Sequence, residues 1–289
     1  MGNSVDSILF RPPKPATPLH PSYRFFIPTT KEIKIPACYF KRAGAQITVL
    51  YSHANAEDLG LMFGWLKCLS RKCNVNILAY DYIGYGESEG IPSEENCYAS
   101  VEAAYDHLIN YRKLDPKQIV IWGRSVGSGP ATYLASKLSL AGTQVGGLIL
   151  ESPFKSVFRI VMDMSCTVVG DKFPNADRIS SITCPTLIMH GTNDKTIPAS
   201  HGKELYELLE SEIKASPLWV EGRGHNDLDY NYDPLVEHVN KYMNQYLPKY
   251  KRKNSFTRIL PTSKSKGCTQ EEKSMLESQP EPPLTTEVS

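Results

Sequence analysis

Three residues of this chain, Ser125, Asp194 and His225, could together perform nucleophilic catalysis. A serine hydroxyl is a poor nucleophile at neutral pH, so it needs a histidine base that is itself oriented by a carboxylate. The three residues occur in the order Ser, Asp, His, and each lies a few residues beyond a short apolar run. Their types and order predict a catalytic triad with Ser125 as nucleophile, Asp194 as orienting acid and His225 as base.

The residues around Ser125 read GRSVG at positions 123–127, the G-x-S-x-G pattern of a serine on a sharp strand–turn–helix connection. Neighbouring side chains would collide at such a turn, so the small residues Gly123 and Gly127 fit it. The turn exposes the hydroxyl, and the N-terminus of the following helix favours negative charge beside it. The pattern alone also occurs in ordinary glycine-serine turns, so its position after an apolar run is what favours a nucleophile.

Each partner of Ser125 has an alternative interpretation. Asp194 could be a turn residue that bonds its own backbone, and His225 could be an ordinary loop histidine. Asp81, at the end of another apolar run, is a rival acid, although its surroundings look like a structural crossing loop. His190 follows a run but precedes the predicted acid, so we expect no catalytic role for it.

Apolar runs alternate with helical stretches along the chain, which predicts an α/β fold. Runs that are apolar on both faces and separated by helices indicate a mostly parallel sheet covered by helices on both sides. The runs are residues 47–51, 75–80, 119–122, 148–150, 186–189 and 218–220. The helical stretches are about 57–71, 93–112, 127–140, 200–212 and 234–247. Ligands of such sheets gather at the carboxyl ends of the strands, where the predicted triad lies.

A tetrahedral intermediate also needs hydrogen-bond donors for its negatively charged oxygen. We expect the Val126 N–H, directly after the nucleophile, to be one of these donors. The second should come from the loop after the first run, and Asn55 is the predicted residue.

Composition excludes several classes of function. The formal net charge is +1, and no basic-aromatic pattern indicates a nucleic-acid surface. We find no metal-ligand motif and no phosphate-binding loop, so no cofactor and no metal are implied. The seven cysteines are scattered without a C-x-x-C pair, which suits reduced thiols in a cytosolic protein. They are Cys38, Cys68, Cys73, Cys97, Cys166, Cys184 and Cys268.

Several motifs together resemble the alpha/beta-hydrolase fold and, within it, the alpha/beta-hydrolase domain-containing protein 17 family of protein depalmitoylases. The motifs are SHANAEDLG, AYDYIGYGESEG, WGRSVGSGP, ESPF, HGTNDKTIP and GRGHND, and the resemblance covers about residues 5–247. It implies the same triad, Ser125, Asp194 and His225. It also implies hydrolysis of long-chain acyl thioesters on the cysteines of membrane-associated proteins, which would be the partners of this chain.

The sequence departs from the family pattern in two places. The loop that usually reads His-Gly-Asn-Ala carries Ala54 in place of glycine, which is tolerable if Ala54 keeps a negative φ. The animal members carry a palmitoylated cysteine cluster near the N-terminus, whereas here no cysteine precedes Cys38.

Another anchor could replace that cluster. The start Met1-Gly2-Asn3-Ser4-Val5 resembles a myristoylation site, although Asp6 stands where Ser or Thr is usual. One myristoyl chain binds membrane only marginally, so a second signal is needed. A basic patch just beyond the last helix could supply it, and it consists of Lys249, Lys251, Arg252 and Lys253. We therefore expect a cytoplasmic protein peripheral to a membrane, while a solvated disordered tail is the alternative for the patch.

The predicted organisation is an N-terminal anchoring segment at 1–22, a hydrolase domain at 23–248 and a tail at 249–289, basic and then mixed in charge and expected to be disordered. Residues of about 153–183 form a short cap, which could shape an apolar slot for an acyl chain or simply pack on the sheet. Two other functions remain open. The triad could serve a small ester, lysophospholipid or peptide, or the fold could be a non-catalytic binding module.

Overall fold

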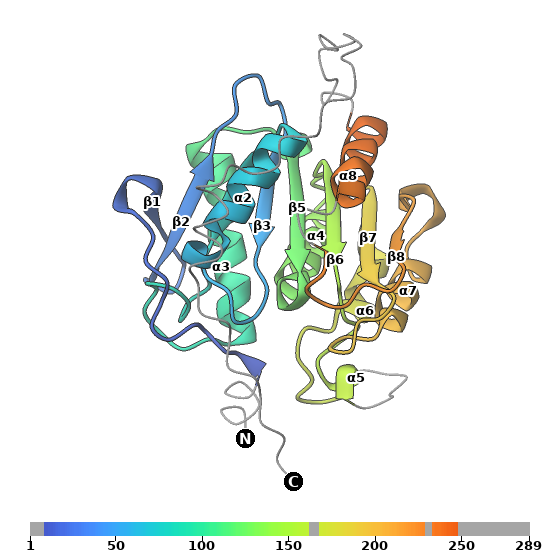
Figure 1. Cartoon of the computed structure of the whole chain (residues 1–289). Helices are drawn as coiled ribbons and strands as arrows, with labels where there is room; N and C mark the ends of the chain where they lie inside the picture. Colours follow the sequence, from blue (N-terminus) through green and yellow to red (C-terminus); the bar gives the residue numbers. More distant parts are fainter. Residues whose placement is uncertain (1–8, 162–167, 229–232, 248–289) are drawn as a thin grey trace. The chain divides into compact units, whose positions relative to one another are not determined.

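Eight strands form one continuous sheet at the centre of the fold (Figure 1). The structure, a computed structural model, describes residues 9–161, 168–228 and 233–247. The strands lie in the order β1-β2-β4-β3-β5-β6-β7-β8. Their bounds are β1 Arg24–Pro28, β2 Lys34–Phe40, β3 Thr48–Ser52, β4 Asn76–Tyr80, β5 Ile119–Arg124, β6 Gly147–Glu151, β7 Thr186–Gly191 and β8 Leu218–Val220. Because β2 is antiparallel to β1 and β4 while all neighbours from β4 to β8 are parallel, the predicted mostly parallel sheet is confirmed.

Helices cover both faces of this sheet, as predicted (Figure 1). The α-helices are α2 Leu59–Cys73, α3 Glu94–Asp106, α4 Ser128–Leu140, α5 Phe158–Val161, α6 Asn175–Arg178, α7 Ala199–Glu207 and α8 Asp233–Tyr246. The short helices are η1 Pro21–Tyr23, η2 His107–Tyr111, η3 Pro116–Gln118, η4 Ser125–Gly127, η5 Ile179–Ser181 and η6 Ser211–Ile213. α2 packs beside α8, and α3 packs beside α4.

Alternate residues of the parallel strands supply two apolar layers. Leu50 and Ile121 belong to the same buried cluster as Leu134 of α4. The next residue along β3, Tyr51, packs instead on Trp65 of α2, with ring centroids 5.1 Å apart. Since successive side chains of a strand point to opposite faces, strands buried on both sides must be apolar throughout. This explains why the sequence shows continuous apolar runs.

The topology brings the loops after β3 and β5 together. These two strands are neighbours, with Ser52 paired to Gly123, but the chain leaves β3 towards β4 on one side and leaves β5 towards β6 on the other. Such a reversal opens a crevice at the carboxyl ends of the strands, where ligands of open α/β sheets bind. The loop 53–58 and the serine turn therefore face the same crevice.

β1 and β2 were not predicted from the sequence. Pro28 ends β1 and Pro36 lies inside β2, and proline cannot donate a hydrogen bond to a neighbouring strand. The two strands add an antiparallel extension to the sheet beside β4.

The cap segment is short and contains α5 and α6. Phe154 and Phe173 are buried in the core cluster that also contains residues of α4, which matches the packing alternative for part of this segment. Residues 162–167 of the predicted cap, which include Met162 and Met164, lie outside the described residues. Gly2 and the basic patch lie outside them too, so the anchor and the segment boundaries stay predictions.

Candidate active site

Ser125 sits at the tip of the turn between β5 and α4. Its φ is 51°, in the left-handed region, which costs a non-glycine residue about 1–2 kcal/mol. A Cβ on Gly123 would overlap the carbonyl oxygen of Gly127, and a Cβ on Gly127 would overlap the carbonyl oxygens of Ser52 and His53. The two glycines are therefore required by close backbone approach around a strained serine, as the sequence pattern suggests.

The three predicted site residues meet in one hydrogen-bonded chain. His225, in the loop after β8, lies with Nε2 2.9 Å from Ser125 Oγ and with Nδ1 2.6 Å from Asp194 Oδ2. Asp194, in the loop after β7, has a fully buried side chain, whereas the side chain of His225 is 12% exposed. The predicted nucleophile, base and acid thus converge from the ends of three strands.

The contacts of Asp194 determine which nitrogen of His225 carries the proton. Burial raises the pKa of Asp194, but hydrogen bonds from His190, His225 and the Ile197 N–H outweigh it and hold the pKa below its ordinary value. An ionised carboxylate only accepts hydrogen bonds, so His225 Nδ1 is the donor. The Nε2 lone pair then accepts the Ser125 hydroxyl, which is the arrangement that a general base requires.

His190, for which the sequence indicated no role, also contacts the acid. Its Nε2 lies 2.9 Å from the Ile197 carbonyl oxygen and 3.2 Å from Asp194 Oδ2. Because the carbonyl oxygen only accepts, Nε2 carries a proton that both acceptors share. The side chain is completely buried, and it contacts the same carboxylate oxygen of Asp194 as His225 does.

Asp81, the rival acid, lies elsewhere. Its Oδ1 accepts the N–H of Leu59 at the start of α2, 2.9 Å away, and is 3.5 Å from Nε2 of His53. Burial raises the pKa of Asp81. It therefore fixes the start of α2, which agrees with a structural crossing loop.

The two residues predicted to donate to the oxyanion are Val126, which lies in the serine turn, and Asn55, which lies in the loop after β3. Val126 is the second residue of η4, and an N–H in the first turn has no acceptor within its helix. The Asn55 N–H has no acceptor among the described residues. The Asn55 side chain, in contrast, bonds to Leu9, Arg11 and Tyr85. Ala54 is not among the residues with positive φ, so it meets the condition under which alanine is tolerated there.

Arg124 joins the loops around the site and was not predicted. Its Nη1 pairs with Glu57, its Nη2 donates to Asn226 Oδ1 at 3.0 Å, and its Nε lies 3.2 Å from Glu151. Glu57 in turn accepts the Ala54 N–H at 2.8 Å. The arginine before the serine thus connects the turn to the loop after β3 and to the neighbour of His225. Because Arg124 occupies a variable position of G-x-S-x-G, the sequence pattern gives no indication that it connects these loops.

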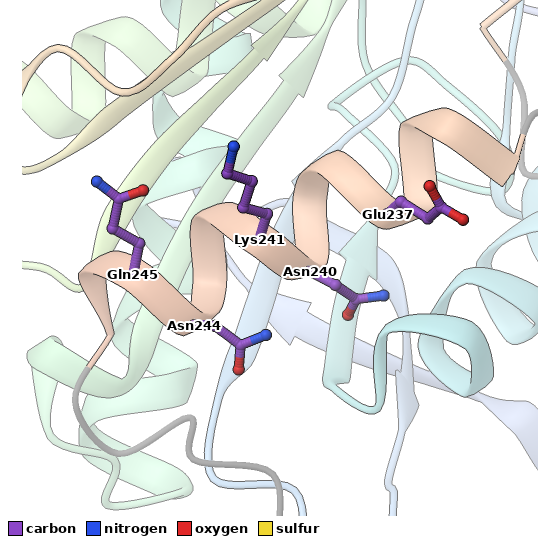
Figure 2. Close-up of a pocket in the computed structure, with 5 residues that line it drawn as sticks. All are labelled: Glu237, Asn240, Lys241, Asn244 and Gln245. Carbon is purple, nitrogen blue, oxygen red and sulfur yellow. The ribbon is translucent and has the colours of Figure 1, made fainter. Parts of the chain in front are cut away.

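A depression of about 550 Å³ lies away from these loops, on α8. Figure 2 shows that its five lining side chains all come from this helix. They are Glu237, Asn240, Lys241, Asn244 and Gln245. None belongs to the triad or to the loops after β3, β5, β7 or β8, so this depression does not bear on the candidate active site.

Among residues 9–161, 168–228 and 233–247, no group of three or more His, Cys, Asp or Glu side chains could hold a metal ion. No helix in the same ranges combines the length and apolar character needed to cross a bilayer.

Known proteins share both the fold and much of the sequence. A family model described as alpha/beta hydrolase fold matches residues 47–165. Human alpha/beta hydrolase domain-containing protein 17B is 41% identical over 226 residues, covering 77% of this chain and 75% of the relative. Mouse alpha/beta hydrolase domain-containing protein 17C is 39% identical over 227 residues, covering 78% and 68%.

Among solved structures, the esterase Pf2001 of Pyrococcus furiosus superposes with a TM-score of 0.64 at 17% identity, covering 82% of this chain and 99% of the esterase. At that identity the likeness shows the fold alone. The identity and coverage of the sequence relatives show more: this chain belongs to the alpha/beta hydrolase domain-containing protein 17 family and is a hydrolase of the alpha/beta-hydrolase fold.

Proposed function

We propose that the chain is a serine hydrolase that removes long-chain acyl groups from cysteines of membrane-associated proteins. The observation that carries the catalytic part is the hydrogen-bonded chain from Ser125 through His225 to Asp194, with the serine on a strained turn. Family membership and the motifs named above support the acyl-thioester substrate. The arrangement needs no cofactor for the steps below.

In the first half of the reaction, Ser125 Oγ attacks the acyl carbon while its proton moves to His225 Nε2. The negative charge that develops on the carbonyl oxygen would be bound by the N–H groups of Val126 and Asn55. When the intermediate collapses, the C–S bond breaks and the cysteine sulfur leaves with the proton from His225. An acyl-serine ester remains on the enzyme.

In the second half, a water molecule attacks the acyl-serine carbon and gives its proton to His225. The bond between the acyl carbon and Ser125 Oγ breaks, and Oγ recovers the proton. A fatty acid and the original enzyme are released. Throughout, the ionised Asp194 stabilises the positive charge of the protonated His225 without taking its proton.

We expect a palmitoyl thioester to be hydrolysed faster than the matched oxygen ester. Cysteine is a better leaving group than serine because its ordinary pKa, near 8.5, is far below that of an alcohol, so we expect at least about a tenfold higher kcat/KM. Two peptides of one sequence, palmitoylated on cysteine or on serine, would be compared with purified enzyme. A butyryl-cysteine peptide tests chain length, and the substrate proposal predicts a lower kcat/KM for it. Equal kcat/KM values for the thioester and the oxygen ester would contradict a thioesterase. A higher kcat/KM for the butyryl peptide would contradict a long-chain substrate and favour small acyl substrates.

We also propose that the protein acts at a cytoplasmic membrane surface, anchored through Gly2 and the basic patch 249–253. Gly2→Ala replaces the glycine that the myristoylation motif requires at this position, so the variant should shift from the membrane to the soluble fraction of expressing cells. The control Asn3→Ala leaves Gly2 in place and should fractionate as the wild type does. Full membrane recovery of Gly2→Ala would contradict acylation as the anchor.

A further inference from the structure

The side chain of Asn55 is bonded to the N-terminal segment of the chain. Asn55 Nδ2 donates to the Leu9 carbonyl oxygen at 2.6 Å, and Asn55 Oδ1 accepts the Arg11 N–H at 2.9 Å. One carboxamide thus pairs with backbone groups on both sides of Phe10. Oδ1 also accepts the Tyr85 hydroxyl at 2.7 Å and the Ala56 N–H at 3.1 Å. These four hydrogen bonds hold the side chain in place, and the donor that the proposed mechanism uses is the Asn55 backbone N–H.

Phe10 anchors the same segment in the core. It is 5% exposed, and its ring meets that of Phe173 edge-on, with centroids 6.0 Å apart. The Phe173 ring lies so close to Gly129 of α4 that a Cβ there would overlap it. Because α4 begins three residues after Ser125, the anchor packs next to the helix that follows the predicted nucleophile.

A second attachment lies further along the segment. The Thr17 N–H donates to Asp58 Oδ2 at 2.7 Å, and Asp58 Oδ1 caps α2 by accepting the Leu61 N–H at 2.9 Å. The Thr17 backbone passes so close to Gly60 that only glycine fits there. The segment is therefore attached at two points, Asn55 and Asp58, to the loop 53–58.

That loop depends on external support because of its own backbone. Ala56 has a φ of 55°, a left-handed conformation that alanine adopts only when its surroundings impose it. The bonds from Asn55 to Leu9, Arg11 and Tyr85 supply part of that constraint. A shift of the loop would move the Asn55 N–H away from the oxygen that it is proposed to bind.

We infer that residues 9–11, here called the N-terminal strap, position the catalytic loop 53–56, with Phe10 and the Asn55 side chain as positioning residues. This inference rests on the proposed function for its catalytic readout. The strap lies within the predicted anchoring segment 1–22 and begins seven residues after Gly2, so the proposed acylation site and the proposed support of the catalytic loop are close in the sequence.

The test uses the full chain and p-nitrophenyl butyrate, a small activated ester. Phe10→Ala and Asn55→Ala should each lower kcat by about 10- to 100-fold with KM within about twofold, because the donor is misplaced while the acyl site is retained. Phe10→Leu, which keeps an apolar anchor, should recover most of the activity.

Lys14→Ala, an exposed change in the same segment, should behave as the wild type does. The kcat of the double variant should be no lower than that of the less active single variant, because both changes release the same loop.

Hydrogen exchange supplies a readout that does not depend on catalysis. Peptides that cover residues 52–60 should exchange faster in Phe10→Ala than in wild type and should be unchanged in Lys14→Ala. Unchanged exchange and unchanged kcat in folded Phe10→Ala would overturn the inference, as would losses that multiply in the double variant. If Phe10→Ala does not fold, Asn55→Ala gives the same two readouts. Hydrolysis by Ser125→Ala at the wild-type rate would refute the proposed function instead, and the exchange result would still decide the role of the strap.

Discussion

Ser125→Ala is expected to lower the kcat/KM for p-nitrophenyl butyrate by about 10⁵- to 10⁶-fold, which is the order of loss when a catalytic serine is removed from a triad. The reason is that the variant has no oxygen to form the acyl-enzyme, while the N–H groups of Val126 and Asn55 remain. Residual turnover should therefore stay above the uncatalysed rate. The measurement is steady-state hydrolysis followed by nitrophenolate absorbance.

The matched control is Ser136→Ala, which removes a serine hydroxyl from α4, the helix that follows the serine turn. Ser136 Oγ bonds to Ser181 Oγ at 2.7 Å, away from the triad, so this variant should retain wild-type kinetics. Alanine tolerates a φ of 51° no worse than serine, so the melting temperature of Ser125→Ala should change little. A folded Ser125→Ala that hydrolyses the ester within tenfold of wild type would exclude the serine as nucleophile.

Asp194→Asn should lower kcat by about 10⁴-fold, because it reverses the proton pattern of His225. Asp194 Oδ1 accepts the N–H groups of Thr196 and Ile197, each at 2.8 Å, and an asparagine must keep its oxygen there. Its amide nitrogen would then replace Oδ2 and donate to His225 Nδ1. The histidine would carry its proton on Nε2, facing Ser125, where it could no longer accept the hydroxyl proton.

Asp227→Asn makes the same chemical change in the loop that carries His225. Asp227 Oδ2 accepts the Gly224 N–H at 2.6 Å, and an asparagine oxygen can accept it equally well. This variant should keep wild-type kcat in the same assay. Comparable losses in Asp194→Asn and Asp227→Asn would point to a disturbed loop and would contradict the tautomer argument.

The fold and the positions of the triad residues could be predicted because both follow from local rules. Strands buried on both faces leave continuous apolar runs, and the carboxyl ends of parallel strands share one edge of the sheet. Ser125, Asp194 and His225 each follow such a run, so their meeting needs no knowledge of other contacts. The hairpin of β1 and β2 was not predicted because prolines such as Pro28 and Pro36 are unfavourable in strands. Pairing of β2 with β4 stabilises the hairpin in spite of them, and that pairing is not visible in the local sequence.

The supporting contacts of the site could not be predicted, since they join residues far apart in the sequence without a repeating pattern. Asn55 meets Leu9 across 46 residues, and Arg124 meets Glu57 across 67. No catalytic role was predicted for His190 because it precedes the acid, yet its ring contacts Asp194, four residues further along the chain. These contacts depend on how separate loops pack over the crevice, and single residue types carry no signal of that packing.

The central claim is that Ser125 is the nucleophile of a serine hydrolase, and covalent labelling tests it most directly. Purified wild type would be treated with a fluorophosphonate probe, digested and analysed by peptide mass spectrometry beside Ser125→Ala. The account predicts one adduct per chain, on the peptide that contains Ser125, and none in the variant. Folded wild type that remains unlabelled, or a Ser125→Ala variant that is labelled like wild type, would contradict it.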